Sequence, residues 1–109
     1  MTFNIRYDNP EDGLNRWDNR KDNVQTLTIQ VCNYLLEELP SVLGVQECKP
    51  HQRQYINDKL RGYYHYVGIP RDLHNDEEVG IFYLSSRFFL LDFGFRWLNE
   101  DGTRGKPGF

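Results

Sequence analysis

The sequence has 109 residues, a formal net charge of −3 at pH 7 and 39% hydrophobic residues. These values predict a single globular domain over residues 1–109, with room for a modest core. The negative charge gives no electrostatic basis for tight, sequence-independent binding to nucleic acid. The spacing of the two cysteines, Cys32 and Cys48, matches neither a disulfide framework nor a zinc site, which favours free thiols in a reducing compartment.

No apolar run approaches the roughly 20 residues that a membrane helix needs, so no membrane span is predicted. The opening residues contain no secretory signal with a charged start and a cleavage site. This pattern favours a cytoplasmic protein, or one from which a targeting segment has been removed.

The chain opens with a strand pattern over residues 2–7, in which apolar and polar side chains alternate. One face carries Phe3, Ile5 and Tyr7, and the other carries Thr2, Asn4 and Arg6.

A polar segment over residues 8–21 follows the first strand and contains Trp17 and Arg20. Its turn-forming residues favour a surface loop held in place by one aromatic side chain. The alternative interpretation is a rim of a binding site, where the Arg20 guanidinium would contact an anionic substrate, since its geometry matches phosphate.

The next segment predicts a helix that begins near Asp22 or Asn23 and ends before Pro40, because its apolar residues follow helical spacing. A short apolar strand over residues 42–46 comes directly after it and ends at Glu47. Strands separated by a helix usually run parallel, and ligands bind beyond the carboxyl ends of parallel strands. We therefore expect Asn4 and Glu47 to lie at neighbouring strand ends.

A second helix is predicted from Pro50, which suits a first helical turn, to Gly62, which suits a helix end. An aromatic-rich strand over residues 63–67 follows, and then a charged loop over residues 70–78. The acidic residues of this loop match no calcium-binding pattern, which favours a solvated loop. Residues 79–84 and 87–98 then predict two antiparallel strands joined by a turn at the two serines between them.

Several segments together resemble the endonuclease/exonuclease/phosphatase superfamily, in the order found in that family. They are residues 2–7, the pair Trp17 and Arg20, residues 42–47 with Gln52 after them, Glu77 and Glu78 leading into residues 81–83, and residues 90–98. The resemblance implies an α/β fold in which two sheets pack face to face between outer helices. This chain would supply half of that four-layered sandwich: one mixed sheet with two helices on its outer face, without the second sheet.

The resemblance also implies a metal-dependent phosphoesterase. Glu47 would be the ligand of Mg²⁺, with Mn²⁺ as a substitute, and Asn4 would lie beside it in the phosphate site. Glu77 or Glu78 would orient a catalytic histidine. A carboxylate is the hard ligand that Mg²⁺ prefers, and an amide can donate to phosphate without adding charge. The substrate would be a phosphoester such as nucleic acid or a phosphoinositide.

The chain lacks counterparts of the histidine and of the Asp and Asn motifs that the later half of the family supplies. We therefore interpret it as the amino-terminal half of such a domain, expected to be inactive alone and either to self-associate or to bind the missing carboxy-terminal half. The alternative is a non-catalytic scaffold or assembly module that keeps the fold but not the chemistry.

Overall fold

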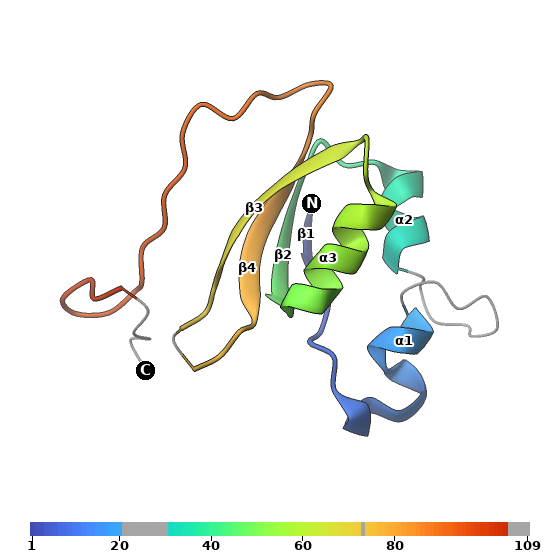
Figure 1. Ribbon diagram of the computed structural model, residues 1–109, viewed down its shortest axis with the longest axis horizontal. Coiled ribbons are helices and arrows are strands. Elements are labelled where there is room, and N and C mark those ends of the chain that lie inside the picture. The colour runs from blue at the N-terminus through green and yellow to red at the C-terminus, as the bar shows by residue number, and fades with distance from the viewer. Residues whose placement is uncertain (21–30, 73, 105–109) are drawn as a thin grey trace.

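The computed structural model describes residues 1–20, 31–72 and 74–104. Within them the chain forms one four-stranded sheet in the order β1-β2-β4-β3 (Figure 1). The strands are β1 (Thr2–Asn4), β2 (Val42–Cys48), β3 (Tyr64–Pro70) and β4 (Glu78–Leu84). β1 pairs with β2 in parallel, whereas β4 is antiparallel to both β2 and β3. The sheet is therefore mixed, as the sequence predicts.

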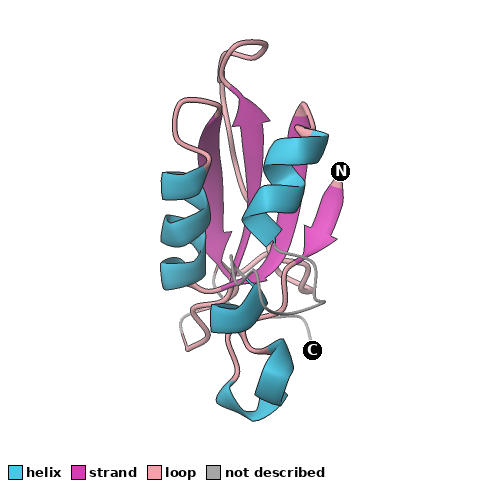
Figure 2. Cartoon of the chain, turned by 90° about the vertical axis from the view of Figure 1, so that its right-hand side faces the viewer, coloured by secondary structure: helices cyan, strands magenta, loops and turns pink. Residues whose placement is uncertain are grey.

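The helices α2 (Val31–Glu38) and α3 (Pro50–Lys59) cover one face of this sheet, and Figure 2 views the sheet from the helix side. α3 begins with Pro50 in its first turn, where the missing N–H is not needed. Gly62 follows its end with φ +87°, a conformation that glycine adopts without strain. The predicted helix over residues 22–39 is confirmed for Val31–Glu38. Its predicted start at Asp22 or Asn23 lies outside the described residues.

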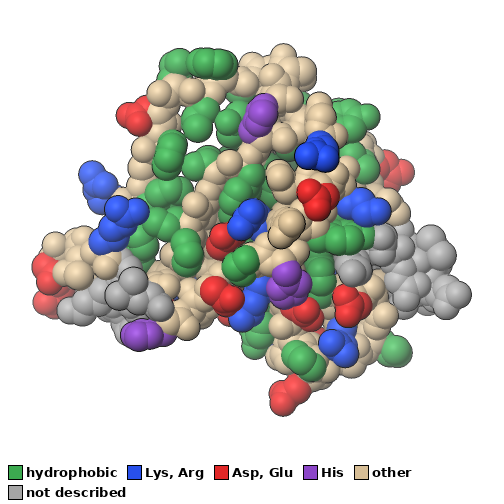
Figure 3. Space-filling model, viewed as in Figure 1, with side chains coloured by type: hydrophobic (Ala, Val, Ile, Leu, Met, Phe, Trp, Pro, Cys, Tyr) green, Lys and Arg blue, Asp and Glu red, His purple; other side chains and the backbone are tan. Residues whose placement is uncertain are grey.

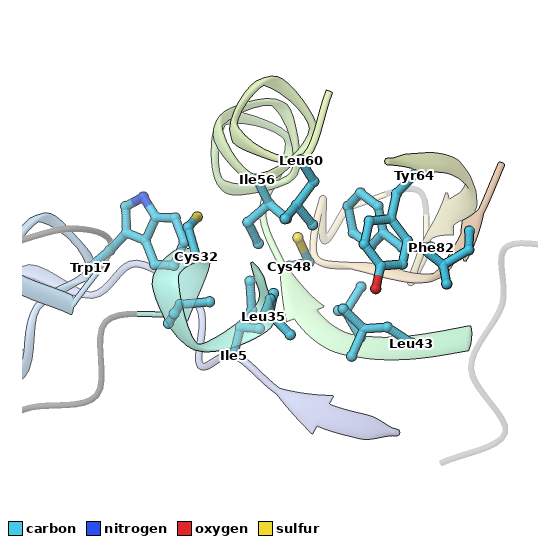
Figure 4. Close-up of a cluster of buried hydrophobic side chains, with 13 residues drawn as sticks. Ile5, Trp17, Cys32, Leu35, Leu43, Cys48, Ile56, Leu60, Tyr64 and Phe82 are labelled. Atoms are coloured by element: carbon cyan, nitrogen blue, oxygen red, sulfur yellow. The ribbon is translucent and has the colours of Figure 1, made fainter. Parts of the chain in front are cut away.

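The core lies between the helices and the sheet (Figure 4). Leu35 of α2, Ile56 of α3, and Leu43 and Phe82 of the sheet are completely buried. Cys32 and Cys48 are also buried in this layer and are free thiols, as predicted. No helix in the described part of the chain is long and apolar enough to cross a membrane.

The opposite face of the sheet is apolar but uncovered over much of its area. Val42, Val79 and Ile81 have 41%, 53% and 45% of their surface exposed. An open hollow of about 400 Å³ lies on this face, lined by Val42 of β2, Ile81 and Tyr83 of β4, and residues 88–92. Nothing in the described residues packs a second sheet here.

The predicted hairpin between residues 79–84 and 87–98 is wrong. β4 forms as predicted, but residues 87–98 are not a strand and leave the sheet as an extended segment (Figure 1). β4 is already paired along one edge with β2 and along the other with β3, so it has no free edge for a third strand. β4 instead forms a hairpin with β3, and the charged loop connects these two strands.

The first strand is shorter than predicted, and the segment after it has more regular structure than the predicted loop. β1 ends at Asn4 rather than at residue 7, because Arg6 has φ +59° and turns the chain out of the strand. The polar segment contains two short helices, η1 (Pro10–Asn15) and α1 (Trp17–Arg20). The Trp17 side chain is buried, so it does hold this segment against the core.

Candidate functional site at the ends of β1 and β2

The side chains of Asn4 and Glu47 meet at the carboxyl ends of the two parallel strands. Asn4 Nδ2 donates a hydrogen bond of 2.8 Å to Glu47 Oε1. The second carboxylate oxygen, Oε2, lies 3.4 Å from the Tyr7 backbone N–H. The sequence places these two residues at neighbouring strand ends, and the structure confirms that juxtaposition.

A β-bulge turns Glu47 toward Asn4. Val45 pairs with Gly80 and Cys48 pairs with Glu78, so β2 uses three steps where β4 uses two. In a regular strand residue 47 would follow Leu43 and Val45 to the helix-covered face. The extra residue instead lets Glu47 reach the side chain of Asn4, which is the known effect of a bulge on side-chain direction.

Two residues of the site have a left-handed backbone that is unfavourable for anything but glycine. Glu47 has φ +57° and Arg6, two residues after Asn4, has φ +59°. Such conformations cost on the order of 1–3 kcal/mol and persist only where the surrounding contacts enforce them. The two segments that carry Asn4 and Glu47 are therefore held in place by other groups.

One of these groups is Gln52, a buried residue of α3 with no exposed surface. Its side chain bonds to the backbone of Arg6, Asp8 and Lys49. In the sequence, Gln52 belongs to the family resemblance but has no predicted role. A signal was present, because a glutamine at the third position of a helix that starts with Pro50 is the acidic or amide half of a capping box.

The second group is Arg20, at the end of α1. Its guanidinium donates to the backbone carbonyls of Ile5 and Arg6, at 2.5 and 3.2 Å, and to that of Asn15 at 2.7 Å. Partial burial lowers the pKa of Arg20 from its ordinary value. The structure thus gives Arg20 a role in supporting the turn after β1. A contact between Arg20 and a substrate stays a prediction.

Glu77 and Glu78, between which the sequence does not decide, have different surroundings. Glu78 is buried, accepts from Arg53 Nε at 3.0 Å and from the Tyr66 hydroxyl at 3.2 Å, and lies on the helix-covered side of β4. Glu77 precedes the strand, and Arg71 Nη1 lies 3.9 Å from its carboxylate. Because Glu78 is held by two partners within the core layer, Glu77 is the better candidate for orienting a group outside it.

Charged side chains surround the junction where β2 ends and α3 begins, and Figure 3 shows acidic, basic and histidine side chains crowded together there. Arg6 forms a two-bonded ion pair with Asp12, which raises the pKa of Arg6 and lowers that of Asp12. His51 Nε2 lies 2.9 Å from Asp8. The Arg6 guanidinium keeps positive charge close to the Glu47 carboxylate.

The donors at this site suit a hard cation that keeps most of its water. Among the described residues, no three His, Cys, Asp or Glu side chains gather as a set of metal ligands. That excludes a zinc-type cage within the described part, but Mg²⁺ commonly binds through one or two carboxylates together with water and substrate phosphate. Each Glu47 oxygen retains a lone pair beyond its bond to the protein.

The comparisons with known proteins agree with this fold. No family model matches the chain, and no curated protein matches it significantly. Among solved structures, an endonuclease/exonuclease/phosphatase from Bacteroides vulgatus is 34% identical with a TM-score of 0.84, covering 99% of this chain and 40% of that chain. A mannosyl-6-phosphatase from Bacteroides thetaiotaomicron is 28% identical with a TM-score of 0.76, covering 91% of this chain and 36% of that chain.

A further endonuclease/exonuclease/phosphatase family protein from Bacteroides thetaiotaomicron is 28% identical with a TM-score of 0.76, covering 91% of this chain and 35% of that chain. The chain thus spans two fifths or less of the length of these proteins. The chain has the fold of the matched part of these endonuclease/exonuclease/phosphatase family proteins.

Proposed function

We propose that this chain carries part of the site of a Mg²⁺-dependent phosphoesterase, with Glu47 as a metal ligand and Asn4 beside the phosphate. The hydrogen bond of 2.8 Å between their side chains supports this most directly. It orients the carboxylate through a neutral amide, and each carboxylate oxygen keeps a lone pair for a metal ion.

A magnesium ion bound there would neutralise charge on a phosphate oxygen. The residues of this chain would orient the ligand and the phosphate. Asn4 would hold Glu47 through one N–H of its amide and leave the other for a phosphate oxygen. Glu77 would orient a histidine supplied from elsewhere in a complete protein, and Mn²⁺ would substitute for Mg²⁺.

The substrate class that we propose is a phosphoester. One similar protein is a mannosyl-6-phosphatase, which favours a small phosphomonoester. The net charge of −3 also favours a small substrate over duplex nucleic acid, whose binding depends on neutralising many phosphates. We expect the chain alone to hydrolyse such substrates very slowly, since losing a general base costs orders of magnitude in rate.

A metal titration tests the assignment of Glu47. We expect the chain to bind Mg²⁺, and E47Q to bind it at least about tenfold more weakly, because an amide oxygen carries no charge. E38Q is the matched control, since Glu38 is an exposed carboxylate at the end of α2. With Mn²⁺ as a paramagnetic probe, the NMR signals of Asn4 and Tyr7 should broaden first. Equal Mg²⁺ binding by the unmodified chain, E47Q and E38Q, or no binding by any of them, would contradict the assignment of Glu47 as a metal ligand.

The uncovered apolar face favours a second candidate, an assembly role. Val79 and Ile81 are about half exposed in the middle of a sheet, and extended apolar surface of this kind usually contacts a partner. We propose that the rest of a complete domain occupies this face, and that the chain alone self-associates through it. Sedimentation should then detect oligomers that the double variant Val79→Lys with Ile81→Lys dissociates. A stable monomer of the unmodified chain would contradict this.

A further inference from the structure

We propose that Gln52 is a positioning residue of the candidate site and sets the distance between Asn4 and Glu47. What the pair binds rests on the proposed function, but the geometry of the pair does not. The side-chain hydrogen bonds of Gln52 to Asp8, Lys49 and Arg6 reach neither Asn4 nor Glu47. It acts on the backbone segments that carry them.

The contacts of Gln52 use both ends of its side-chain amide. Oε1 accepts from the backbone N–H of Asp8 at 3.0 Å and from that of Lys49 at 3.1 Å. Nε2 donates to the carbonyl of Arg6 at 3.0 Å. The side chain has no exposed surface, so water cannot replace these bonds without opening the core.

These three bonds join the two strand ends to each other. Arg6 and Asp8 lie on either side of Tyr7, whose N–H faces Glu47 Oε2. Lys49 lies two residues after Glu47 in the chain. A single buried amide therefore ties the turn after β1 to the end of β2, across the gap that the Asn4 and Glu47 side chains span.

Backbone strain explains why such a tie is needed. Arg6 and Glu47 both have positive φ, and each would relax toward an ordinary conformation if the contacts around it were lost. Arg20 supports the turn from the other side, because its guanidinium also donates to the carbonyl of Arg6. Of Gln52 and Arg20, only Gln52 also bonds to Lys49 and so connects the turn after β1 to the end of β2.

Two variants separate the ends of the amide. Gln52→Met keeps the length of the side chain but removes all three bonds. Gln52→Glu keeps an oxygen for Asp8 and Lys49 but places an oxygen against the Arg6 carbonyl. Ile56, one turn further along α3 and also completely buried, supplies the control. Ile56→Val or Ile56→Ala is chosen to match the loss of stability that the Gln52 variants show.

Two readouts are measured where every variant is folded. The first is the NMR signal of the Asn4 side-chain amide, which reports its bond to Glu47 without metal. The second is the affinity for Mg²⁺. We expect Gln52→Met to shift the amide signal and to weaken Mg²⁺ binding roughly 10- to 100-fold, as loss of outer-sphere support does. Gln52→Glu should weaken it less, and the Ile56 control should change neither readout.

The outcomes distinguish this inference from the proposed function. If Gln52→Met and the matched Ile56 variant leave both readouts unchanged, or change them equally, Gln52 is only a core residue. If Gln52→Met does not fold, the same comparison is made with Gln52→Glu. If the unmodified chain binds no Mg²⁺ but the Asn4 signal still shifts in the Gln52 variants, the positioning role stands and the metal assignment falls.

Discussion

Both faces of β4 carry large apolar side chains, but their surroundings differ. Glu78, Gly80, Phe82 and Leu84 face the helices and are buried, whereas Val79 and Ile81 face the other way and are about half exposed. A strand that is apolar on both sides is typical of a sheet covered on both sides. Here only one cover is present among the described residues, which agrees with similar proteins that are at least twice as long.

This difference also shows how the candidate site is built. The covered face supplies support, because Gln52 is buried within it and its side chain bonds to the backbone of both strand-end segments. The uncovered side presents Asn4, paired in register with Gln46. Chemistry and support therefore come from opposite sides of the same sheet.

The strongest contrast between the faces is expected for neighbouring apolar residues. Phe82→Ala should lower the free energy of unfolding by about 3–5 kcal/mol, since it leaves a cavity in a packed layer. Ile81→Ala should change it by only about 0.5 kcal/mol, because its side chain is 45% exposed. Urea denaturation of both variants measures this. Similar losses would mean that the outer face is also covered in solution.

The glycines of the two faces should differ less, but in the same direction. A Cβ on Gly80 would overlap the Tyr66 ring, so Gly80→Ala must displace Tyr66 and its bond to Glu78, at a cost of about 1–3 kcal/mol. A Cβ on Gly44, at the outer face, would lie 3.7 Å from its nearest atom, the Gln46 amide nitrogen. Gly44→Ala should therefore be nearly neutral. Thermal unfolding of the pair is the measurement, and equal melting temperatures would count against the packing of Tyr66.

The smallest effect concerns pH and the covered face. Burial raises the pKa of the Cys48 thiol from 9.0 to about 12. A raised pKa in the folded state stabilises the protein fully below pH 9, and this contribution is lost as pH rises from 9 to about 12, because the unfolded chain releases its proton first. We expect stability to fall between pH 8 and 10.5, by up to about 2 kcal/mol from this thiol. The stability of Cys48→Ala should fall less over this range. An identical fall in both proteins would assign the effect to other groups.

Much of the fold follows from local sequence signals. The strand at residues 42–46, the helix from Pro50 and the stop at Gly62 are confirmed, because apolar spacing, a first-turn proline and a glycine end each act within a few residues. The meeting of Asn4 and Glu47 follows from the parallel pairing of their strands. These features depend on local chemistry and on one crossover.

The errors arise where distant parts of the chain compete. Residues 87–98 have strand composition, but strand formation needs a free neighbouring edge, and β2 and β3 occupy both edges of β4. The bulge at Glu47 and the positive φ of Arg6 also have no local signal, since neither residue is a glycine. The roles of Gln52 and Arg20 depend on backbone groups 46 and 14 residues away, which no pattern within either helix reveals.

The extra residue near the end of β2 makes the presentation of the carboxylate depend on segment length. Deleting Gln46 would restore simple alternation between Val45 and Cys48, and Glu47 would then take the place of Gln46 on the uncovered face. A glutamate would still be present in such a protein, yet without the left-handed backbone at position 47 that now brings its carboxylate to Asn4. Related chains should accordingly be compared by the number of residues in this segment before they are compared by whether glutamate is conserved.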